Sequence, residues 1–286
     1  MRIDELLTVA TRQLEQAGVD NPALDARLLL QHLSAMTRSE LVLHGDRAVD
    51  SSLLNQYCQL VEQRGQRIPL QHLIGSQEFW SLDFIVSPAV LIPRPETEFL
   101  LEQALTICVG SRIEHALDMC TGSGVIAVVL ARELACPVTA VDLSEAALAV
   151  AATNVACHNV ADRVDLVCSD LFAGLNPRQQ YDLIVSNPPY VVDGEIEGLE
   201  PEVARFEPRL ALSGGTGGLD CIARIAVAAE SFLRPGGWLF LEIGADQKEA
   251  VRALLAAPER RYGDVAVLDD WAGRARVAQA RYTPVV

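Results

Sequence analysis

From about residue 114 to the end of the chain, short apolar runs alternate with longer stretches of helical periodicity, and this alternation limits the possible folds most strongly. The apolar runs have the length and β-branched content of buried strands and lie at residues 116–119, 138–141, 164–167, 182–186, 238–243, 265–268 and 276–282. Helical stretches between them include residues 125–134, 145–157 and 219–233. Alternating strands and helices predict a doubly wound, seven-stranded α/β sheet with ligand sites at the carboxyl ends of its strands.

The first 75 residues carry a helical pattern and no strand signal. Ile3, Leu6 and Leu14 recur at the spacing of one helix face, and further helices are expected to begin at Asn21-Pro22 and near Asp50. We therefore predict three parts. They are a helical bundle (1–75), a hairpin with a proline-rich connector (76–98) and the α/β domain (99–286).

The formal net charge of −15 argues against direct binding to nucleic acid, because such binding draws its strength from Lys and Arg at phosphates. No apolar run approaches the roughly 18 residues of a membrane span. The seven cysteines and five histidines are scattered without metal-ligand spacing, so no metal site is predicted. We expect a cytoplasmic protein with no membrane partner.

A glycine turn follows the first predicted strand of the α/β domain. It comprises Cys120, Thr121, Gly122, Ser123 and Gly124, and it opens a helix. Such a turn lets a ligand approach the backbone closely, although any tight strand-to-helix turn also needs glycine. The turn lacks the full dinucleotide fingerprint, which argues against a hydride-transfer enzyme.

Acidic residues follow the next two strands. Asp142 is placed to accept hydrogen bonds from the hydroxyls of a ribose, or else to stabilise the start of a helix. Asp170 can receive an adenine amino group while Leu171 and Phe172 cover the ring, or these residues can be a helix cap followed by core. Three consecutive strand ends thus favour an adenosine-containing cofactor.

Asn187, Pro188, Pro189 and Tyr190 end the fourth strand. The two prolines remove backbone donors, so the Asn187 side-chain oxygen and the Pro188 carbonyl can project as two acceptors that match a planar NH2 group. An amide nitrogen is a poor nucleophile, and acceptors outside its plane would localise the lone pair toward an electrophile. We therefore predict catalytic roles for Asn187, Pro188 and Tyr190, and substrate contacts from all four residues.

The Asn-Pro-Pro-Tyr run resembles that of amino methyltransferases acting on planar nitrogens. Residues 66–98, with Ile92-Pro93-Arg94-Pro95-Glu96-Thr97-Glu98, and the segments at 206–208 and 236–239 are similar to the HemK/PrmC family of N5-glutamine methyltransferases of release factors. The resemblance implies a class I S-adenosylmethionine-dependent, Rossmann-like methyltransferase domain. The implied cofactor contacts are residues 120–124, Asp142, Leu171 and Asn187, with S-adenosyl-L-homocysteine as product.

The substrate implied by this resemblance is the glutamine of the Gly-Gly-Gln tripeptide in class 1 peptide chain release factors. The resemblance also implies that the helical bundle (1–75) helps to dock this substrate. Cys120 stands where the family usually has Gly, and the turn containing it is also similar to that of the sister enzyme acting on ribosomal protein L3. Methylation of L3 therefore remains an alternative. Methylation of adenine N6 is a weaker one, because the acidic charge disfavours it.

An acidic stretch follows the Asn-Pro-Pro-Tyr run, with Asp193, Glu195, Glu197, Glu200, Glu202 and Glu207. A dense group of like charges is usually solvated, and we expect a solvated loop here. The alternative is a gate that complements a basic protein substrate.

Overall fold

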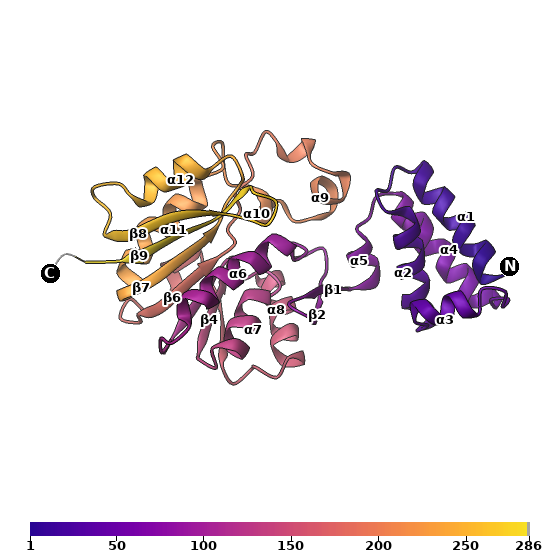
Figure 1. The fold of residues 1–286 in the computed structure, drawn as a ribbon, viewed down its shortest axis with the longest axis horizontal. Helices are drawn as coiled ribbons and strands as arrows, with labels where there is room; N and C mark the ends of the chain where they lie inside the picture. The colour runs from indigo at the N-terminus through magenta and orange to yellow at the C-terminus, as the bar shows by residue number, and fades with distance from the viewer. Residues whose placement is uncertain (285–286) are drawn as a thin grey trace. The chain divides into compact units, whose positions relative to one another are not determined.

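The structure is a computed structural model that describes residues 1–284. The chain forms two compact units (Figure 1). The first contains Met1–Ser76 together with Glu200–Phe206, and the second contains Gln77–Leu199 and the chain from Glu207 onward. The segment Glu200–Phe206 thus belongs with the N-terminal helices, although it is distant from them in the sequence.

The first unit is helical. Its helices are α1 (Ile3–Gln16), α2 (Pro22–Ser34), α3 (Arg38–Leu43), α4 (Ser51–Gly65), α5 (Leu70–Ile74) and α9 (Pro201–Phe206). The three predicted helices are present, whereas the short α3, α5 and α9 were not predicted. Tyr57 is fully buried in this unit's core, and its hydroxyl donates to the Ala26 carbonyl at 2.9 Å.

Glu202 secures its segment within the first unit. Its carboxylate lies 2.8 Å from Arg64 and 2.6 Å from Arg67, and Arg64 also pairs with Asp25 at 2.7 Å. The side chains of Arg64 and Glu202 are only 8% and 14% exposed, so these charges are paired away from solvent. The expectation of a solvated acidic loop is therefore wrong for Glu202.

Glu207, at the end of the same acidic stretch, is also buried. It accepts hydrogen bonds from the Ile92 backbone at 3.2 Å and from Arg94 at 2.7 Å, all within the second unit. The Glu207 side chain therefore holds the proline-rich connector. Glu195, Glu197 and Glu200 are exposed as expected.

A seven-stranded mixed sheet forms the centre of the second unit. Its strands are β3 (Ala116–Met119), β4 (Val138–Asp142), β5 (Val164–Cys168), β6 (Tyr181–Ser186), β7 (Leu233–Glu242), β8 (Tyr262–Asp269) and β9 (Ala275–Tyr282). Their order is β5-β4-β3-β6-β7-β9-β8, and β9 runs antiparallel to both of its neighbours. A separate hairpin of β1 (Ser76–Phe79) and β2 (Leu82–Ile85) precedes this sheet.

Helices cover both faces of the sheet. In Figure 1, α6 (Pro95–Cys108), α7 (Val125–Glu133) and α8 (Glu145–Cys157) lie on one side, and α11 (Asp220–Phe232) and α12 (Lys248–Leu255) lie on the other. Successive β6 residues alternate between the two resulting cores, with Leu183 and Val185 in one and Ile184 in the other. This confirms the predicted fold class.

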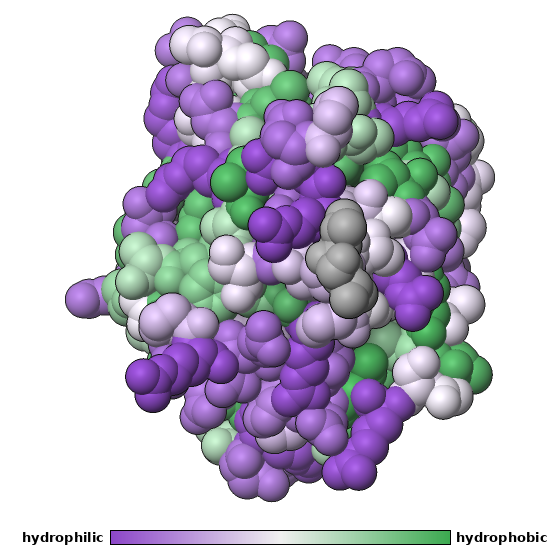
Figure 2. All heavy atoms as spheres, turned by 90° about the vertical axis from the view of Figure 1, so that its left-hand side faces the viewer, coloured by the Kyte–Doolittle hydropathy of each residue, from purple (hydrophilic) through white to green (hydrophobic). Residues whose placement is uncertain are grey.

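Shorter helical turns lie in the connections, at η1 (Leu171–Gly174), η2 (Ile196–Gly198) and α10 (Arg209–Leu212). On the face shown in Figure 2, hydrophilic side chains predominate and hydrophobic ones form smaller areas between them. Among residues 1–284, no helix is both long enough and apolar enough to span a bilayer.

The strand order reverses between β3 and β6, which is where open α/β sheets bind ligands. Met119 pairs with both Val141 and Ser186 across the neighbouring strands. The residues that follow, Cys120 and Asn187, therefore leave the sheet at the same edge as Asp142.

Candidate active site

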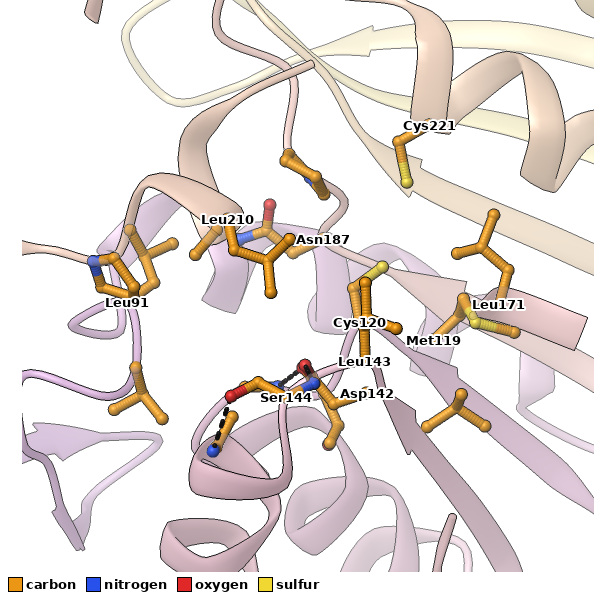
Figure 3. Close-up of a pocket in the computed structure, with 18 of the residues that line it drawn as sticks. Leu91, Met119, Cys120, Asp142, Leu143, Ser144, Leu171, Asn187, Leu210 and Cys221 are labelled. Carbon is orange, nitrogen blue, oxygen red and sulfur yellow. Dashed lines mark hydrogen bonds between the residues drawn. The ribbon is translucent and has the colours of Figure 1, made fainter. Parts of the chain in front are cut away.

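A cavity of about 360 Å³ opens at this edge of the sheet. Asn187 and Leu210 lie on one side of it, with Asp142 and Ser144 opposite (Figure 3). Residues 120–123 of the glycine turn also line it. Its volume lies within the usual range of small-molecule sites.

The glycine turn depends on left-handed backbone at three positions. Cys120, Gly122 and Gly124 have φ of +63°, +54° and +83°. A Cβ at Gly122 would meet no protein atom within 4 Å, so this residue leaves space for a ligand. A Cβ at Gly124 would lie 3.1 Å from the Cβ of Ala151, so this glycine instead allows α7 to approach α8.

Asp118 organises the turn from beneath. Its Oδ2 accepts hydrogen bonds from the Thr121 hydroxyl at 2.5 Å and from the Ala127 backbone at 2.9 Å, and the residue is fully buried. Burial raises the pKa of Asp118 to about 7. Its Oδ1 has no hydrogen-bond partner among the described residues.

Asp142 joins two of the elements that border the cavity. Its Oδ2 accepts from the Gly122 backbone at 2.8 Å, and its Oδ1 accepts from the Ser144 backbone at 2.9 Å, at the start of α8. Asp142 therefore has the structural role that the sequence offered as an alternative, which is to stabilise the start of a helix. Each carboxylate oxygen has a further lone pair, and Asp142 lines the cavity, so a ribose contact is compatible with that role.

The residues after β5 separate into two groups. Asp170 and Leu171 line the cavity, and Asp170 also forms an exposed ion pair with Arg224 at 2.8 Å, which lowers the pKa of its carboxyl. Phe172 is not among the cavity-lining residues. Its ring stacks on Phe232 with centroids 4.8 Å apart, so Phe172 belongs to the core. The structure therefore agrees with the alternative of a core residue and not with the predicted contact between Phe172 and a cofactor ring.

Asn187 is connected to a buried carboxyl group. Its Nδ2 donates to the Thr97 hydroxyl at 3.0 Å, and that hydroxyl donates to Oε2 of Glu242 at 2.7 Å. The Tyr190 hydroxyl donates to the other oxygen of Glu242 at 3.3 Å. Thr97 and Glu242 are 2% and 1% exposed, so these two side chains have little contact with solvent, and Thr97 forms part of the cavity wall beside Asn187.

The other residues of the Asn-Pro-Pro-Tyr run differ in whether they line the cavity or pack behind it. Pro189 lines the cavity, whereas Pro188 is buried and does not line it. Tyr190 packs against the core beneath α11, and its backbone carbonyl accepts from Gln247 at 2.9 Å. In this structure Tyr190 therefore supports the run and does not line the cavity.

Sequence reasoning missed Thr97 and Glu242 as members of this network. Thr97 lies within the proline-rich connector, and Glu242 is a single acid at the end of the otherwise apolar run Trp238-Leu239-Phe240-Leu241. A charged residue at the end of a buried strand was the available signal. Cys221, whose sulfur points toward that of Cys120 in Figure 3, was also missed as a cavity residue.

The chain is similar to known proteins over nearly its whole length. Residues 5–75 match the family described as the PrmC N-terminal domain, and residues 95–200 match the methyltransferase small domain. The release factor glutamine methyltransferase of Cereibacter sphaeroides is 43% identical, over 98% of this chain and 99% of that one. The chain belongs to the release factor glutamine methyltransferase family. The Salmonella typhimurium member is 40% identical, over 99% of this chain and 100% of its own.

Solved structures show the same fold in more distant methyltransferases. One from Pyrococcus furiosus has a TM-score of 0.51 at 18% identity, covering 72% of this chain and 91% of that one. The hMettl16 catalytic domain has a TM-score of 0.57 at 17% identity, covering 78% of this chain and 81% of that one. The second unit of this family member therefore has the class I methyltransferase fold.

Proposed function

We propose that this protein transfers the methyl group of S-adenosyl-L-methionine to the side-chain amide nitrogen (N5) of a glutamine, the one in the Gly-Gly-Gln motif of class 1 peptide chain release factors. S-adenosyl-L-homocysteine is the second product. The observation that carries the proposal is the orientation of Asn187 at the cavity. Its NH2 group donates to Thr97, so its oxygen is the atom able to accept from a substrate amide.

The cavity suits the cofactor in size and chemistry. Gly122 leaves space for close approach to the backbone, Asp142 offers carboxylate acceptors for a ribose, and Leu171 gives an apolar contact for a ring. Cys120, Thr121, Ser123 and Asp170 complete the proposed contacts on this side, with Gly124 shaping the turn. Bound S-adenosyl-L-methionine would supply an electrophilic methyl group on its sulfonium sulfur.

Asn187 and Pro188 are proposed to activate the substrate amide. The Asn187 Oδ1, at the cavity wall, would accept one amide hydrogen, and the Pro188 carbonyl would accept the other, so that both are held outside the amide plane. Pro188 does not line the cavity in this structure, so contact with its carbonyl would form only when the substrate binds. The nitrogen lone pair would then be localised, and both acceptors would stabilise the positive charge that develops on nitrogen. As the nitrogen–carbon bond forms, the bond between the methyl group and the sulfonium sulfur would break, and one amide hydrogen would leave to solvent as a proton. Precise positioning replaces the strong base that an amide would otherwise need.

The first unit is proposed to dock the release factor. Support comes from its match to the PrmC N-terminal domain, and from full-length relatives that carry the release factor name. The proposed partner is therefore a protein and not a nucleic acid. This role also implies a cytoplasmic location, where release factors meet ribosomes.

The deciding experiment supplies methyl-labelled cofactor with three separate substrates, namely a class 1 release factor, ribosomal protein L3 and DNA. Mass spectrometry should locate the label on the glutamine of the Gly-Gly-Gln motif. A release factor with that glutamine changed to alanine is the control and should remain unlabelled. Label on L3 or DNA, with none on the release factor, would refute the proposed substrate.

A further inference from the structure

The network behind Asn187 has a direction that the hydrogen-bond chemistry determines. An ionised carboxylate can only accept, so the Thr97 hydroxyl must donate its single hydrogen to Glu242. Thr97 can then only accept from Asn187, which turns the Asn187 NH2 group toward Thr97. The Asn187 oxygen consequently takes the opposite side of the amide.

The orientation of this amide matters for the reaction. If the Asn187 side chain were rotated by half a turn, its NH2 group would meet the substrate NH2, and two donors would face each other. An amide without a directing partner can adopt either orientation. The proposed chemistry needs only the one that presents Oδ1.

We propose that Glu242 and Thr97 are positioning residues, which act in series to hold the Asn187 side chain with its oxygen toward the substrate amide. This inference rests on the proposed function. Neither residue is assigned a direct part in methyl transfer, because each acts through Asn187.

The same carboxylate also anchors the other end of the run. Glu242 Oε1 accepts from the Tyr190 hydroxyl, which fixes the backbone turn that contains both prolines. Glu242, the last residue of β7, is therefore linked both to Asn187, through Thr97, and to Tyr190. A single group that positions both ends keeps the acceptor geometry within narrow limits.

The direction of the network depends on the charge of Glu242. Burial raises the pKa of Glu242 to about 7, and the negative charge of Glu96 on α6 also raises it. Three neighbours lower this pKa: the hydrogen bond from Thr97, the charge of Arg276 on β9 and the hydrogen bond from Tyr190. A protonated Glu242 can donate to Thr97. Thr97 could then donate to Asn187 and reverse the amide, so the proposal predicts a loss of turnover as pH falls through about 7.

The first test compares Thr97→Val with Thr97→Ser. Valine keeps the shape but removes the hydroxyl, so the turnover number kcat for release factor methylation should fall by roughly 10- to 100-fold while KM changes by less than about threefold. Serine should restore most of the loss. Thr106→Val, on the exposed side of the same helix, is the matched control and should resemble the wild type.

A second test uses pH and Glu242→Gln. The wild-type kcat should rise between pH 6 and about 8, whereas the glutamine variant should be slower and should lack that rise, because it has no proton to lose. A purely structural role would lower the melting temperature without removing the pH dependence. Wild-type kcat in Thr97→Val, or the same pH dependence in Glu242→Gln, would overturn the inference.

Nuclear magnetic resonance separates failure of the inference from failure of the proposed function. The side-chain NH2 signals of Asn187, labelled with nitrogen-15, should shift in Thr97→Val and stay unchanged in Thr106→Val, whether or not a release factor is methylated. Unchanged signals in Thr97→Val would reject the positioning role. Absence of release factor methylation by the wild type would reject only the proposed substrate.

Discussion

The carboxylate of Asp142 accepts a hydrogen bond from the backbone nitrogen of Gly122 at 2.8 Å, and so ties the end of β4 to the glycine turn after β3. The acid proposed to hold the cofactor ribose is therefore also part of the frame of the turn. Any change at Asp142 acts on both.

Asp142→Ala should weaken cofactor binding by about 1 to 3 kcal/mol, because hydrogen bonds to a charged group are lost. Asp142→Asn retains an acceptor for one backbone contact and should lose less. Isothermal titration calorimetry with S-adenosyl-L-methionine measures both. Equal affinity in the wild type and Asp142→Ala would contradict the ribose assignment.

Asn187→Ala should abolish methyl transfer while cofactor affinity stays within about tenfold of the wild type, because the acceptor acts mainly in the transition state. Single-turnover assays and cofactor titrations separate the two effects. Asn176→Ala, at an exposed loop position outside the cavity, provides the control. Near-normal turnover in Asn187→Ala would eliminate the mechanism.

Gly124→Ala should destabilise the second unit by about 1 to 3 kcal/mol, because a side chain there combines left-handed strain with overpacking. The added Cβ would lie 3.1 Å from Ala151. Gly110→Ala is the matched control, since Gly110 has φ of +78° but no atom within 4 Å of the new Cβ. All three tryptophans, Trp80, Trp238 and Trp271, lie in the second unit, so urea unfolding followed by their fluorescence reports its stability. Equal losses in both variants would refute the packing argument.

Asp118 should make the second unit less stable as pH rises from about 4 to 7. Its pKa is near 4 in an unfolded chain and about 7 when buried, so the folded state binds more protons within this window. Its stabilising contribution is complete below about pH 4 and is lost as pH passes 7, a change on the order of 4 kcal/mol. Urea unfolding at several pH values should show a smaller decline in Asp118→Asn than in the wild type. The exposed Asp165→Asn should behave as the wild type, and an unchanged decline in Asp118→Asn would disprove the assignment.

Much of the fold can be predicted from local patterns of apolar residues, glycine and proline in the sequence. The apolar period of two or of three to four residues marks strands and helices, because each element must bury one face or stripe. The glycine turn and the Asn-Pro-Pro-Tyr run mark strand ends, because glycine and proline restrict or release the backbone directly. The sequence alone therefore predicts that one edge of the sheet carries residues 120–124, 142 and 187.

Contacts between distant segments could not be read in this way. Asn187 meets Thr97 across 90 positions, and Thr97 meets Glu242 across 145. Periodicity predicts that Glu242 ends a buried strand, but not which side chain satisfies its charge. The same is true of Glu202, which a charge pattern assigned to solvent and which two arginines hold instead.

The order of strands and helices, the family resemblance and the residues at the strand ends can all be read from the sequence. Three features required the folded chain: Phe172 faces the core, β9 runs antiparallel between β7 and β8, and Asn187 is linked through Thr97 to a buried carboxylate. Local patterns specify backbone conformation and degree of burial, whereas the partner of a buried polar group depends on which distant elements pack against it.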